Sequence, residues 1–254
     1  YGHPCAMTKI QEIAKDCRLY VIEDCAEALG ALYEDKLVGS FGNAACFSFF
    51  GNKTLTTGEG GMVLFRDREI YERAKMLRDH GMSKVRKYWH LEVGYNYRMT
   101  NLQAAVGVAQ MERVQSILNK KKMVAEYYYR GLSGISEIGL PPQAAWATPV
   151  NWLYTIKIKN TAGLGRDELS DRLILNGIET RPVFYPLHLM PPYLPYCTGK
   201  SFPITEGVSA SGLSLPSSVT LTRNDVNMVL ESIKSIIGVR KMAIAAGVVT
   251  ENHD

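Results

Sequence analysis

The spacing of apolar residues predicts alternating strands and helices over the first half of the chain. Several apolar runs have strand length, whereas residues 51–61 are too rich in Gly and Thr to be core. Other segments repeat apolar residues at helical spacing. The runs of strand length are residues 19–22, 45–50 and 62–65, and the helical segments are residues 8–17, residues 67–80 and a stretch that begins after Asn101. Strands that alternate with helices are typical of an α/β fold.

Local end signals accompany these segments. Thr8 and Gln11 fit a capping box, in which each side chain satisfies a free backbone N–H of the other residue. Gly81 directly follows the helix over residues 67–80 and is a candidate left-handed cap. We therefore expect the first helix to begin near Thr8, and the short apolar run that follows it to form a buried strand ending in Glu23 and Asp24.

After Leu132 the pattern changes to Gly, Pro and short strands. Residues 152–158 alternate like a strand with one wet face, and residues 166–176 form a helical pattern. Prolines spread over residues 182–195 predict an extended loop, and loops of this length are uncommon unless they have a function. A last helix begins at Thr222, with Asp225 completing a cap, and is expected to bury Val226, Val229, Leu230, Ile233 and Ile237.

This change of pattern predicts two domains. We expect residues 1–132 to belong to a large domain, residues 133–238 to form a smaller α+β domain, and residues 239–254 to be a tail.

The composition is that of an ordinary soluble enzyme, since 46% of the residues are hydrophobic and 21% are charged. No apolar stretch approaches the roughly 20 residues of a membrane-spanning helix. The net charge of +4 is spread along the chain, so neither a nucleic acid nor a membrane is an expected partner. Lys120, Lys121 and Lys122 lie in a helical pattern and are interpreted as a solvated face. Five cysteines without Cys-x-x-Cys spacing indicate reduced thiols and a cytoplasmic protein, and no metal site is expected.

Lys53 is the first candidate for chemistry, because it follows an apolar strand and lies in a glycine-bearing loop. A phosphate-binding P-loop fails at two of its defining positions, one of which is Asn52 directly before the lysine. A Schiff-base lysine must be partly desolvated so that its amine can act as a nucleophile, and Phe47, Phe49 and Phe50 are able to supply a dry wall. The other interpretation is a surface lysine in a turn.

Two polar residues nearby favour the Schiff-base interpretation. A pyridoxal phosphate site needs a lysine, an acid beside the pyridine nitrogen and donors for the phosphate. Asp24 ends one expected strand and Lys53 follows another, so both side chains can face one crevice at the carboxyl edge of the sheet. Ser48 offers a hydroxyl at the turn before the lysine. Each residue alone has a structural explanation, but together they form a coherent cofactor site.

Several separated motifs, in order along nearly the whole chain, resemble the DegT/DnrJ/EryC1/StrS family of pyridoxal-phosphate-dependent sugar aminotransferases. The motifs are Val21 to Gly30, Phe47 to Lys53, Thr57 to Gly61, Gly94 to Met99, Arg181 to His188, and Leu215 to Ser217. The resemblance implies an α/β fold like that of aspartate aminotransferase, with a mixed, mostly parallel sheet flanked by helices. The residues of these motifs are most similar to those of the nucleotide-sugar branch that makes 4-amino-4,6-dideoxy sugars such as perosamine.

The resemblance also implies roles for individual residues. Lys53 would hold the cofactor and move protons, Asp24 would pair with the pyridine nitrogen, and Ser48 would bind the cofactor phosphate. Glu27 lies where many relatives have Gln or His near the ring hydroxyl. Asn96 would reach the phosphate held by the neighbouring subunit, which implies a homodimer with shared active sites.

The activity implied by the resemblance is transfer of an amino group from glutamate to a nucleotide-linked 4-keto-6-deoxy sugar. Arg181 follows an expected strand and is a candidate for binding an acidic donor or the nucleotide phosphates. His188, in the proline-rich loop, is either a contact to the sugar or its phosphates or a packed, hydrogen-bonded residue.

The alternative is a non-catalytic or truncated relative that acts as a binding or assembly partner. Family members have an N-terminal third before the segment that matches Tyr1, and this third contains a phosphate-binding turn and the aromatic ring that stacks on the cofactor. Two interpretations follow: the chain is a fragment of a longer protein, or it is the entire polypeptide and its cofactor pocket lacks a wall. The intact set of Asp24, Ser48 and Lys53 opposes a purely non-catalytic role.

Overall fold

The computed structural model describes residues 1–245, with side chains through residue 238. These residues divide into two compact units. The first unit contains residues 2–119 and 143–152, and the second contains Tyr1, residues 120–142 and the described residues from 153 onward. Residues 239–245, at the start of the predicted tail, continue the last helix, and residues 246–254 lie outside the described residues.

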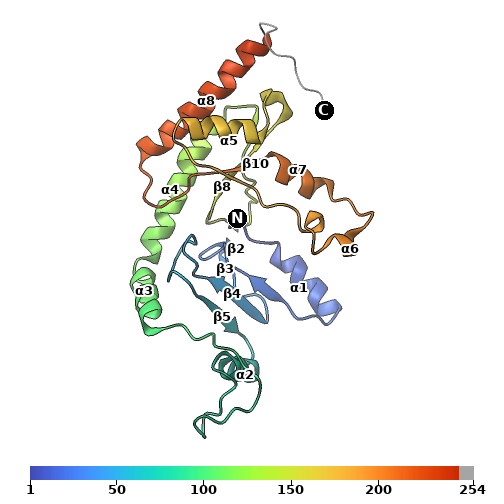
Figure 1. Cartoon of the computed structure of the whole chain (residues 1–254), viewed down its shortest axis with the longest axis vertical. Helices are drawn as coiled ribbons and strands as arrows, with labels where there is room; N and C mark the ends of the chain where they lie inside the picture. The colour runs from blue at the N-terminus through green and yellow to red at the C-terminus, as the bar shows by residue number, and fades with distance from the viewer. Residues whose placement is uncertain (246–254) are drawn as a thin grey trace. The chain divides into compact units, whose positions relative to one another are not determined.

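The first unit is built on a mixed sheet in the order β1–β4–β5. Strands β1 (Ile22–Asp24) and β4 (Ala44–Ser48) are parallel. Strand β5 (Gly61–Phe65) pairs antiparallel with β4 and lies beside it in Figure 1. A second, antiparallel sheet has the order β3–β2–β7. Its strands are β2 (Leu32–Tyr33), β3 (Lys36–Leu37) and β7 (Ala147–Thr148), and the helices of this unit are α1 (Met7–Asp16), α2 (Arg68–Arg78) and α3 (Asn101–Met111). The predicted strands near residues 45–50 and 62–65 are confirmed.

The second unit contains an antiparallel sheet in the order β6–β8–β10–β9, and helix α5 lies beside α8 (Figure 1). The strands are β6 (Ile138–Gly139), β8 (Tyr154–Ile158), β9 (Arg181–Pro182) and β10 (Gly212–Leu215). The helices are α5 (Arg166–Leu175), α6 (Leu194–Cys197), α7 (Pro203–Ser211), α8 (Arg223–Ala245) and the short 3₁₀ turns η1 (Asn160–Ala162) and η2 (Leu187–Leu189). Helix α4 (Val114–Leu132) contains the boundary between the units.

The end signals read from the sequence are mostly confirmed. Asp67 accepts hydrogen bonds from the first backbone N–H groups of α2, and Thr222 and Asp225 cap α8 reciprocally. Gly81 and Gly177 adopt left-handed φ angles of 63° and 74° just after α2 and α5. The five apolar residues expected on the inner face of the last helix are all buried.

The capping box expected at Thr8 and Gln11 is wrong. Helix α1 begins at Met7, and its N-cap makes no side-chain hydrogen bond. The Thr8 hydroxyl accepts a hydrogen bond from the Tyr33 hydroxyl at 2.8 Å, and the Gln11 amide donates to the Phe41 carbonyl at 3.0 Å. The side chains of Thr8 and Gln11 therefore bind residues that are distant in sequence and do not cap the helix.

The buried strand expected over residues 19–22 is also wrong. Strand β1 begins only at Ile22, whose side chain is 73% exposed, and Tyr20 is 80% exposed. The buried residue of this strand is the acid Glu23. The sequence analysis expected the apolar residue Ile22 to be buried, but the pairing with β4 buries its neighbour Glu23. Neighbouring residues of a strand point to opposite faces, so a shift of one residue exchanges the buried and the exposed side chain.

Lys121 corrects the interpretation of the lysine cluster as a solvated face. Its side chain is buried in the second unit, and its Nζ donates to the Ser217 carbonyl at 2.7 Å. Two helical turns further along α4, the Tyr128 hydroxyl donates to the Pro216 carbonyl at 2.9 Å. The two side chains hold the segment after β10 against α4. Burial lowers the pKa of Lys121 to about 8.

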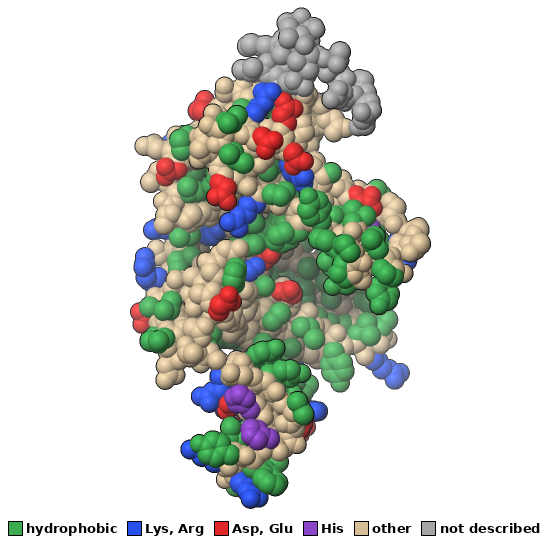
Figure 2. Space-filling view, viewed as in Figure 1, with side chains coloured by type: hydrophobic (Ala, Val, Ile, Leu, Met, Phe, Trp, Pro, Cys, Tyr) green, Lys and Arg blue, Asp and Glu red, His purple; other side chains and the backbone are tan. Residues whose placement is uncertain are grey.

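Exposed apolar side chains gather over the segment from α6 to α7, where Figure 2 shows hydrophobic side chains together on the surface. The exposed residues here are Leu194, Tyr196, Phe202 and Ile204. Among the described residues, none of the helices has the length and apolar character needed to cross a membrane.

The lowered pKa of Lys121 predicts a pH-dependent stability. The folded chain releases the lysine proton above about pH 8, whereas the unfolded chain keeps it to about pH 10.5, so the free energy of unfolding rises with pH in this window. From pH 7 to pH 10 the wild type should gain about 2 kcal/mol relative to Lys121→Met, as measured by urea unfolding followed by circular dichroism. Lys120→Met, at an exposed neighbour, keeps Lys121 and should gain stability with pH as the wild type does. An equal rise in the stability of Lys121→Met and Lys120→Met would contradict this account.

Candidate active site

The parallel pairing of β1 with β4 brings the predicted acid close to the strand that leads to the lysine. Asp24 lies opposite Cys46 in this register, and β4 ends two residues later at Ser48. The Asp24 carboxylate accepts the Ala26 backbone N–H at 3.0 Å and lies 3.9 Å from the Cys46 sulfur, which is a donor to it. Both strands thus end at one edge of the sheet, where the chain turns into loops.

Lys53 lies in the loop that joins β4 to β5, and this loop is tied to itself. The Phe49 backbone N–H donates to Gly60, and the Phe49 carbonyl accepts from the Thr57 backbone N–H and the Thr56 hydroxyl. The Lys53 backbone N–H donates to the Phe50 carbonyl at 3.0 Å. These bonds close a compact loop at the end of the hairpin and fix where the lysine leaves the sheet.

The side chain of Lys53 is mostly shielded, with 14% of it exposed. Its Nζ lies 3.5 Å from Glu27 Oε1 and 4.0 Å from the centroid of the Trp152 ring. Trp152 is 3% exposed, and its Nε1 donates to the Asn52 carbonyl at 2.7 Å. The sequence-based interpretation of Lys53 as a surface lysine therefore does not describe its environment, which is partly desolvated and contains one carboxylate and one aromatic face.

Glu23 organises the strand that carries Asp24. Its buried carboxylate accepts three backbone N–H groups, from Gly39 at 2.7 Å, Phe41 at 2.8 Å and Gly42 at 2.6 Å. A buried carboxylate is stable only when such donors satisfy it. Glu23 therefore fastens the turn before β4 onto β1, on the face of the strand opposite to Asp24.

The two cysteines of this region remain thiols rather than nucleophiles. Burial raises the pKa of Cys25 to about 12, with a further contribution from the negative charge of Glu23. Burial and the charge of Asp24 also raise the pKa of Cys46. A protonated Cys46 is able to donate to the Asp24 carboxylate, and all five cysteines of the chain are free, as the sequence predicted.

The residues at this edge fit the pyridoxal phosphate that the sequence resemblance implies. They offer a shielded amine, an exposed carboxylate on a neighbouring strand and the Ser48 hydroxyl. In addition, the buried hydroxyl of Thr54, directly after the lysine, has no hydrogen-bond partner among the described residues. Buried polar groups are usually paired, so an orphaned hydroxyl beside the lysine is consistent with a polar group that binds here.

The remaining candidates lie on other elements of the chain. Asn96 is exposed and forms an isolated bridge with Asp79 in the first unit. Arg181 is exposed in β9 of the second unit. His188, in the same unit, is buried, and its Nε2 lies 2.9 Å from Glu206 Oε1. Hydrogen bonds from the Phe202 backbone and from His188 lower the pKa of the Glu206 carboxyl. The packed interpretation of His188 is thus the one its contacts favour.

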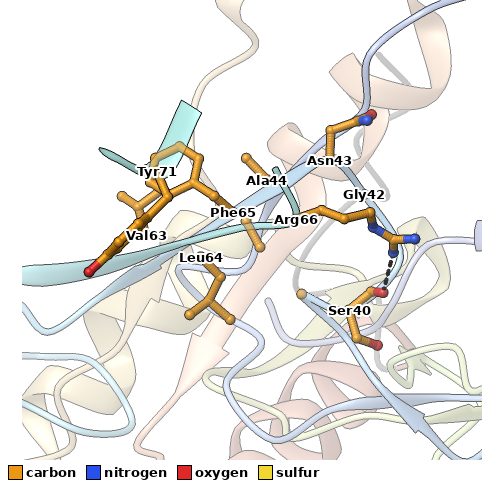
Figure 3. A pocket seen from close by; sticks show the side chains of 11 residues that line it. Ser40, Gly42, Asn43, Ala44, Val63, Leu64, Phe65, Arg66 and Tyr71 are labelled. Carbon is orange, nitrogen blue, oxygen red and sulfur yellow. Dashed lines mark hydrogen bonds between the residues drawn. The ribbon is translucent and has the colours of Figure 1, made fainter. Parts of the chain in front are cut away.

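A groove of about 480 Å³ lies at the opposite end of β4 and contains none of the predicted site residues. Its lining comes from the starts of β4 and α2 and from the end of β5, and Figure 3 shows Arg66 reaching across to the Ser40 carbonyl. This groove is therefore separate from the lysine site.

Three residues at the site were not found from the sequence. Glu23 was noted as one of two acids at a strand end, Cys46 as a free cysteine at a position where a P-loop needs glycine, and Trp152 as the start of an alternating strand. The contacts of Trp152 cross a sequence separation of 100 residues to Asn52. Residue spacing carries no signal for such a contact.

Comparisons with known proteins show the family of the chain. A family model described as the DegT/DnrJ/EryC1/StrS aminotransferase family matches residues 1–234. The chain is 42% identical over 233 residues to the GDP-perosamine synthase of Escherichia coli O157:H7, covering 92% of this chain and 62% of that protein. It is also 42% identical over 238 residues to the GDP-perosamine synthase of Caulobacter vibrioides, covering 93% of this chain and 64% of the relative.

Solved structures show the same fold. The crystal structure of S. venezuelae DesV has a TM-score of 0.86 and 35% identity, covering 93% of this chain and 63% of that chain. The aminotransferase TlmJ from Streptoalloteichus hindustanus has a TM-score of 0.86 and 27% identity, covering 94% and 64%. The expected aminotransferase-like fold is confirmed. The chain spans less than two thirds of the length of each of these relatives.

The role of Glu23 predicts that its charge is needed for stability. Glu23→Gln should lower the free energy of unfolding by about 2 kcal/mol, because an amide NH₂ then faces backbone N–H donors. All three tryptophans, Trp89, Trp146 and Trp152, belong to the first unit, so urea unfolding followed by tryptophan fluorescence reports on this unit. The control Glu92→Gln, at an exposed ion pair of the same unit, should cost less than about 0.5 kcal/mol. Equal costs would contradict the proposed clamp.

Proposed function

The chain belongs to the DegT/DnrJ/EryC1/StrS aminotransferase family, and on that premise we propose that it acts as a pyridoxal-phosphate-dependent sugar aminotransferase. The observation that carries the proposal is the placement of Lys53, shielded beside Trp152, on the loop that follows the strand paired with Asp24. A surface lysine in a turn would need neither the desolvation nor the carboxylate on the neighbouring strand.

Each residue at the sheet edge has a chemical task in this proposal. Pyridoxal phosphate, when bound, supplies an electron sink for the carbon that loses a proton. Lys53 Nζ holds the cofactor and then carries the proton between the reacting carbons. The Asp24 carboxylate keeps a proton on the pyridine nitrogen, and the Cys46 thiol orients that carboxylate by donating to it. The Ser48 hydroxyl binds the phosphate.

The substrates follow from the relatives. Two relatives at 42% identity are GDP-perosamine synthases, which supports a nucleotide-linked sugar as the substrate. A 4-keto-6-deoxy sugar as the amino acceptor and glutamate as the donor are proposed from the sequence resemblance. We assign Arg181 to an anionic group of either substrate, because it is exposed and guanidinium pairs with carboxylates and phosphates. His188 stays a weaker candidate for the sugar, because Glu206 already engages its ring.

The proposed assembly is a homodimer in the cytoplasm. Asn96 is exposed and is proposed to reach the cofactor phosphate held by a second copy, so that each active site is shared. Glu27 is proposed to lie near the ring hydroxyl as well as beside Lys53. The five free cysteines support a reducing compartment. A large and a small domain are proposed, and the compact units move the predicted boundary after residue 132, because residues 120–132 belong to the second unit and residues 143–152 to the first.

A second candidate is a binding or assembly partner without catalysis. It is favoured by the exposure of apolar residues on both faces of β5, where Met62, Val63 and Leu64 are each about half exposed, since such a strand is usually covered. The retained Asp24, Ser48 and Lys53 oppose it. This candidate predicts that the protein forms complexes but binds no pyridoxal phosphate.

Lys53 should be required for cofactor binding. The wild type incubated with pyridoxal phosphate should absorb visible light, and Lys53→Ala should lose that band. Borohydride treatment followed by peptide mass spectrometry should place a pyridoxyl phosphate group on Lys53. The control Lys120→Ala changes an exposed lysine of α4 and should remain coloured. A wild type that stays colourless would argue strongly against the aminotransferase proposal.

The acceptor should be identified by half-reactions. Glutamate should bleach the visible band of the loaded protein, and a nucleotide-linked 4-keto-6-deoxy sugar should restore it. Free sugar without the nucleotide should restore it at least about tenfold more slowly, because charged hydrogen bonds to the diphosphate are lost. Mass spectrometry should detect the aminated nucleotide sugar. Equal rates with free sugar would contradict the proposed substrate class.

A further inference from the structure

The surroundings of the Lys53 amine contain a second recognition element besides Glu27. The Trp152 ring lies 4.0 Å from Nζ, measured to the ring centroid, and the indole is 3% exposed. Its Nε1 donates to the Asn52 carbonyl at 2.7 Å. The ring therefore cannot turn without losing a buried hydrogen bond, and its face is fixed relative to the residue just before the lysine.

This contact distinguishes the charged lysine from the neutral one. The face of an indole is electron-rich and attracts an ammonium group, and tryptophan is the strongest of the aromatic residues in this respect. A neutral amine gains no comparable attraction. Because the ring is buried, little water competes with the contact, which strengthens it. The Glu27 carboxylate, 3.5 Å from the same nitrogen, has the same preference for the charged form.

We propose that Trp152 is a positioning residue whose indole face receives the Lys53 ammonium whenever Nζ is not bonded to the cofactor. This inference rests on the proposed function, because it assigns a place to the lysine during the part of the reaction in which Lys53 carries a proton. Trp152 belongs to the same compact unit as the lysine loop, and its hydrogen bond to Asn52 fixes the position of the ring relative to that loop.

The assignment explains why a residue 99 positions further along the chain covers the lysine. The segment of residues 143–152 returns to the first unit after α4 has left it. It contributes β7, which pairs with β2, and its last residue lies on Lys53. A released lysine that swung into solvent would have to be ordered again for the next proton transfer, at a cost in side-chain entropy. A fixed aromatic face keeps the amine within reach.

The alternatives are that Trp152 only fills space, or that Glu27 alone holds the ammonium. Two substitutions separate these possibilities from the proposal. Trp152→Leu keeps an apolar side chain but removes the aromatic face, and Trp152→Phe keeps a weaker face while removing the donor to Asn52. The matched control is Trp146→Leu, because Trp146 lies in the same segment but packs on Tyr33 and His3 rather than on Lys53.

The test measures the carbamylation rate of Lys53 by cyanate in the full chain before cofactor is added, using peptide mass spectrometry. Cyanate reacts with the neutral amine only. Trp152→Leu should be labelled about fivefold faster than the wild type at neutral pH, and this ratio should fall to one at high pH, where the ammonium is no longer present. Trp152→Phe should show a smaller increase of about twofold, and Trp146→Leu should match the wild type.

The pH profile separates positioning from simple shielding. If Trp152 only shields the amine, the ratio of rates will be the same at every pH, and the proposal is wrong. An unchanged rate in Trp152→Leu, with the whole effect in Glu27→Gln, also overturns it. Should Trp152→Leu fail to fold by circular dichroism, the Trp152→Phe profile decides, since its ratio must likewise decline toward one at high pH.

The same experiment keeps this inference apart from the proposed function. Pyridoxal phosphate should protect Lys53 from cyanate in the wild type, and absence of protection would count against the aminotransferase proposal without touching the contact between Trp152 and the ammonium. Protection together with a pH-independent ratio would overturn the role of Trp152 while leaving the proposed function in place.

Discussion

The parallel pairing of β1 with β4 is the constraint on which the site depends. A parallel pair brings the carboxyl ends of two strands to one edge, and here one strand ends in Asp24 while the other leads through Ser48 to Lys53. An antiparallel pair would place the end of β1 beside the start of β4. The hairpin between β4 and β5 then returns the chain past the lysine, and its loop is closed by bonds to Phe49.

Hydrogen bonds from side chains then fix the positions of the segments that the strand pairing brings together. Glu23 holds the turn at residues 39–42, Cys46 donates to Asp24, and Trp152 is anchored to Asn52 beside the lysine. None of these side chains is required by the general α/β pattern. They narrow the range of positions available to Asp24 and Lys53, the two groups proposed to act on the cofactor, which is what catalysis by positioned groups requires.

The sequence predicted the strands near residues 45–50 and 62–65 and the helix that Asp67 caps, because these depend on local runs. It also led to Asp24 and Lys53, whose roles stay predictions. It failed where tertiary contacts override a local signal, as at Thr8 and Gln11, which bond across to Tyr33 and Phe41. It also failed at Lys121, since three consecutive lysines on a helix necessarily point in different directions and one of them points inward.

The contribution of Trp152 could not be predicted for a different reason. Its contact with Lys53 depends on how residues 143–152 rejoin the first unit, and that path is set by the pairing of β7 with β2 rather than by any pattern around the tryptophan. Roles assigned through the resemblance, such as that of Asn96, involve a second copy of the chain and stay predictions.

The convergence of three amide groups on the single carboxylate of Glu23 has a consequence for how this protein can vary. A connection between strands normally tolerates added or lost residues, because its ends are held only by the strands themselves. Here the spacing of the amides at 39, 41 and 42 must match the reach of one side chain. Insertions and deletions should therefore be accepted in the solvent-facing turns of the molecule but excluded from this short stretch.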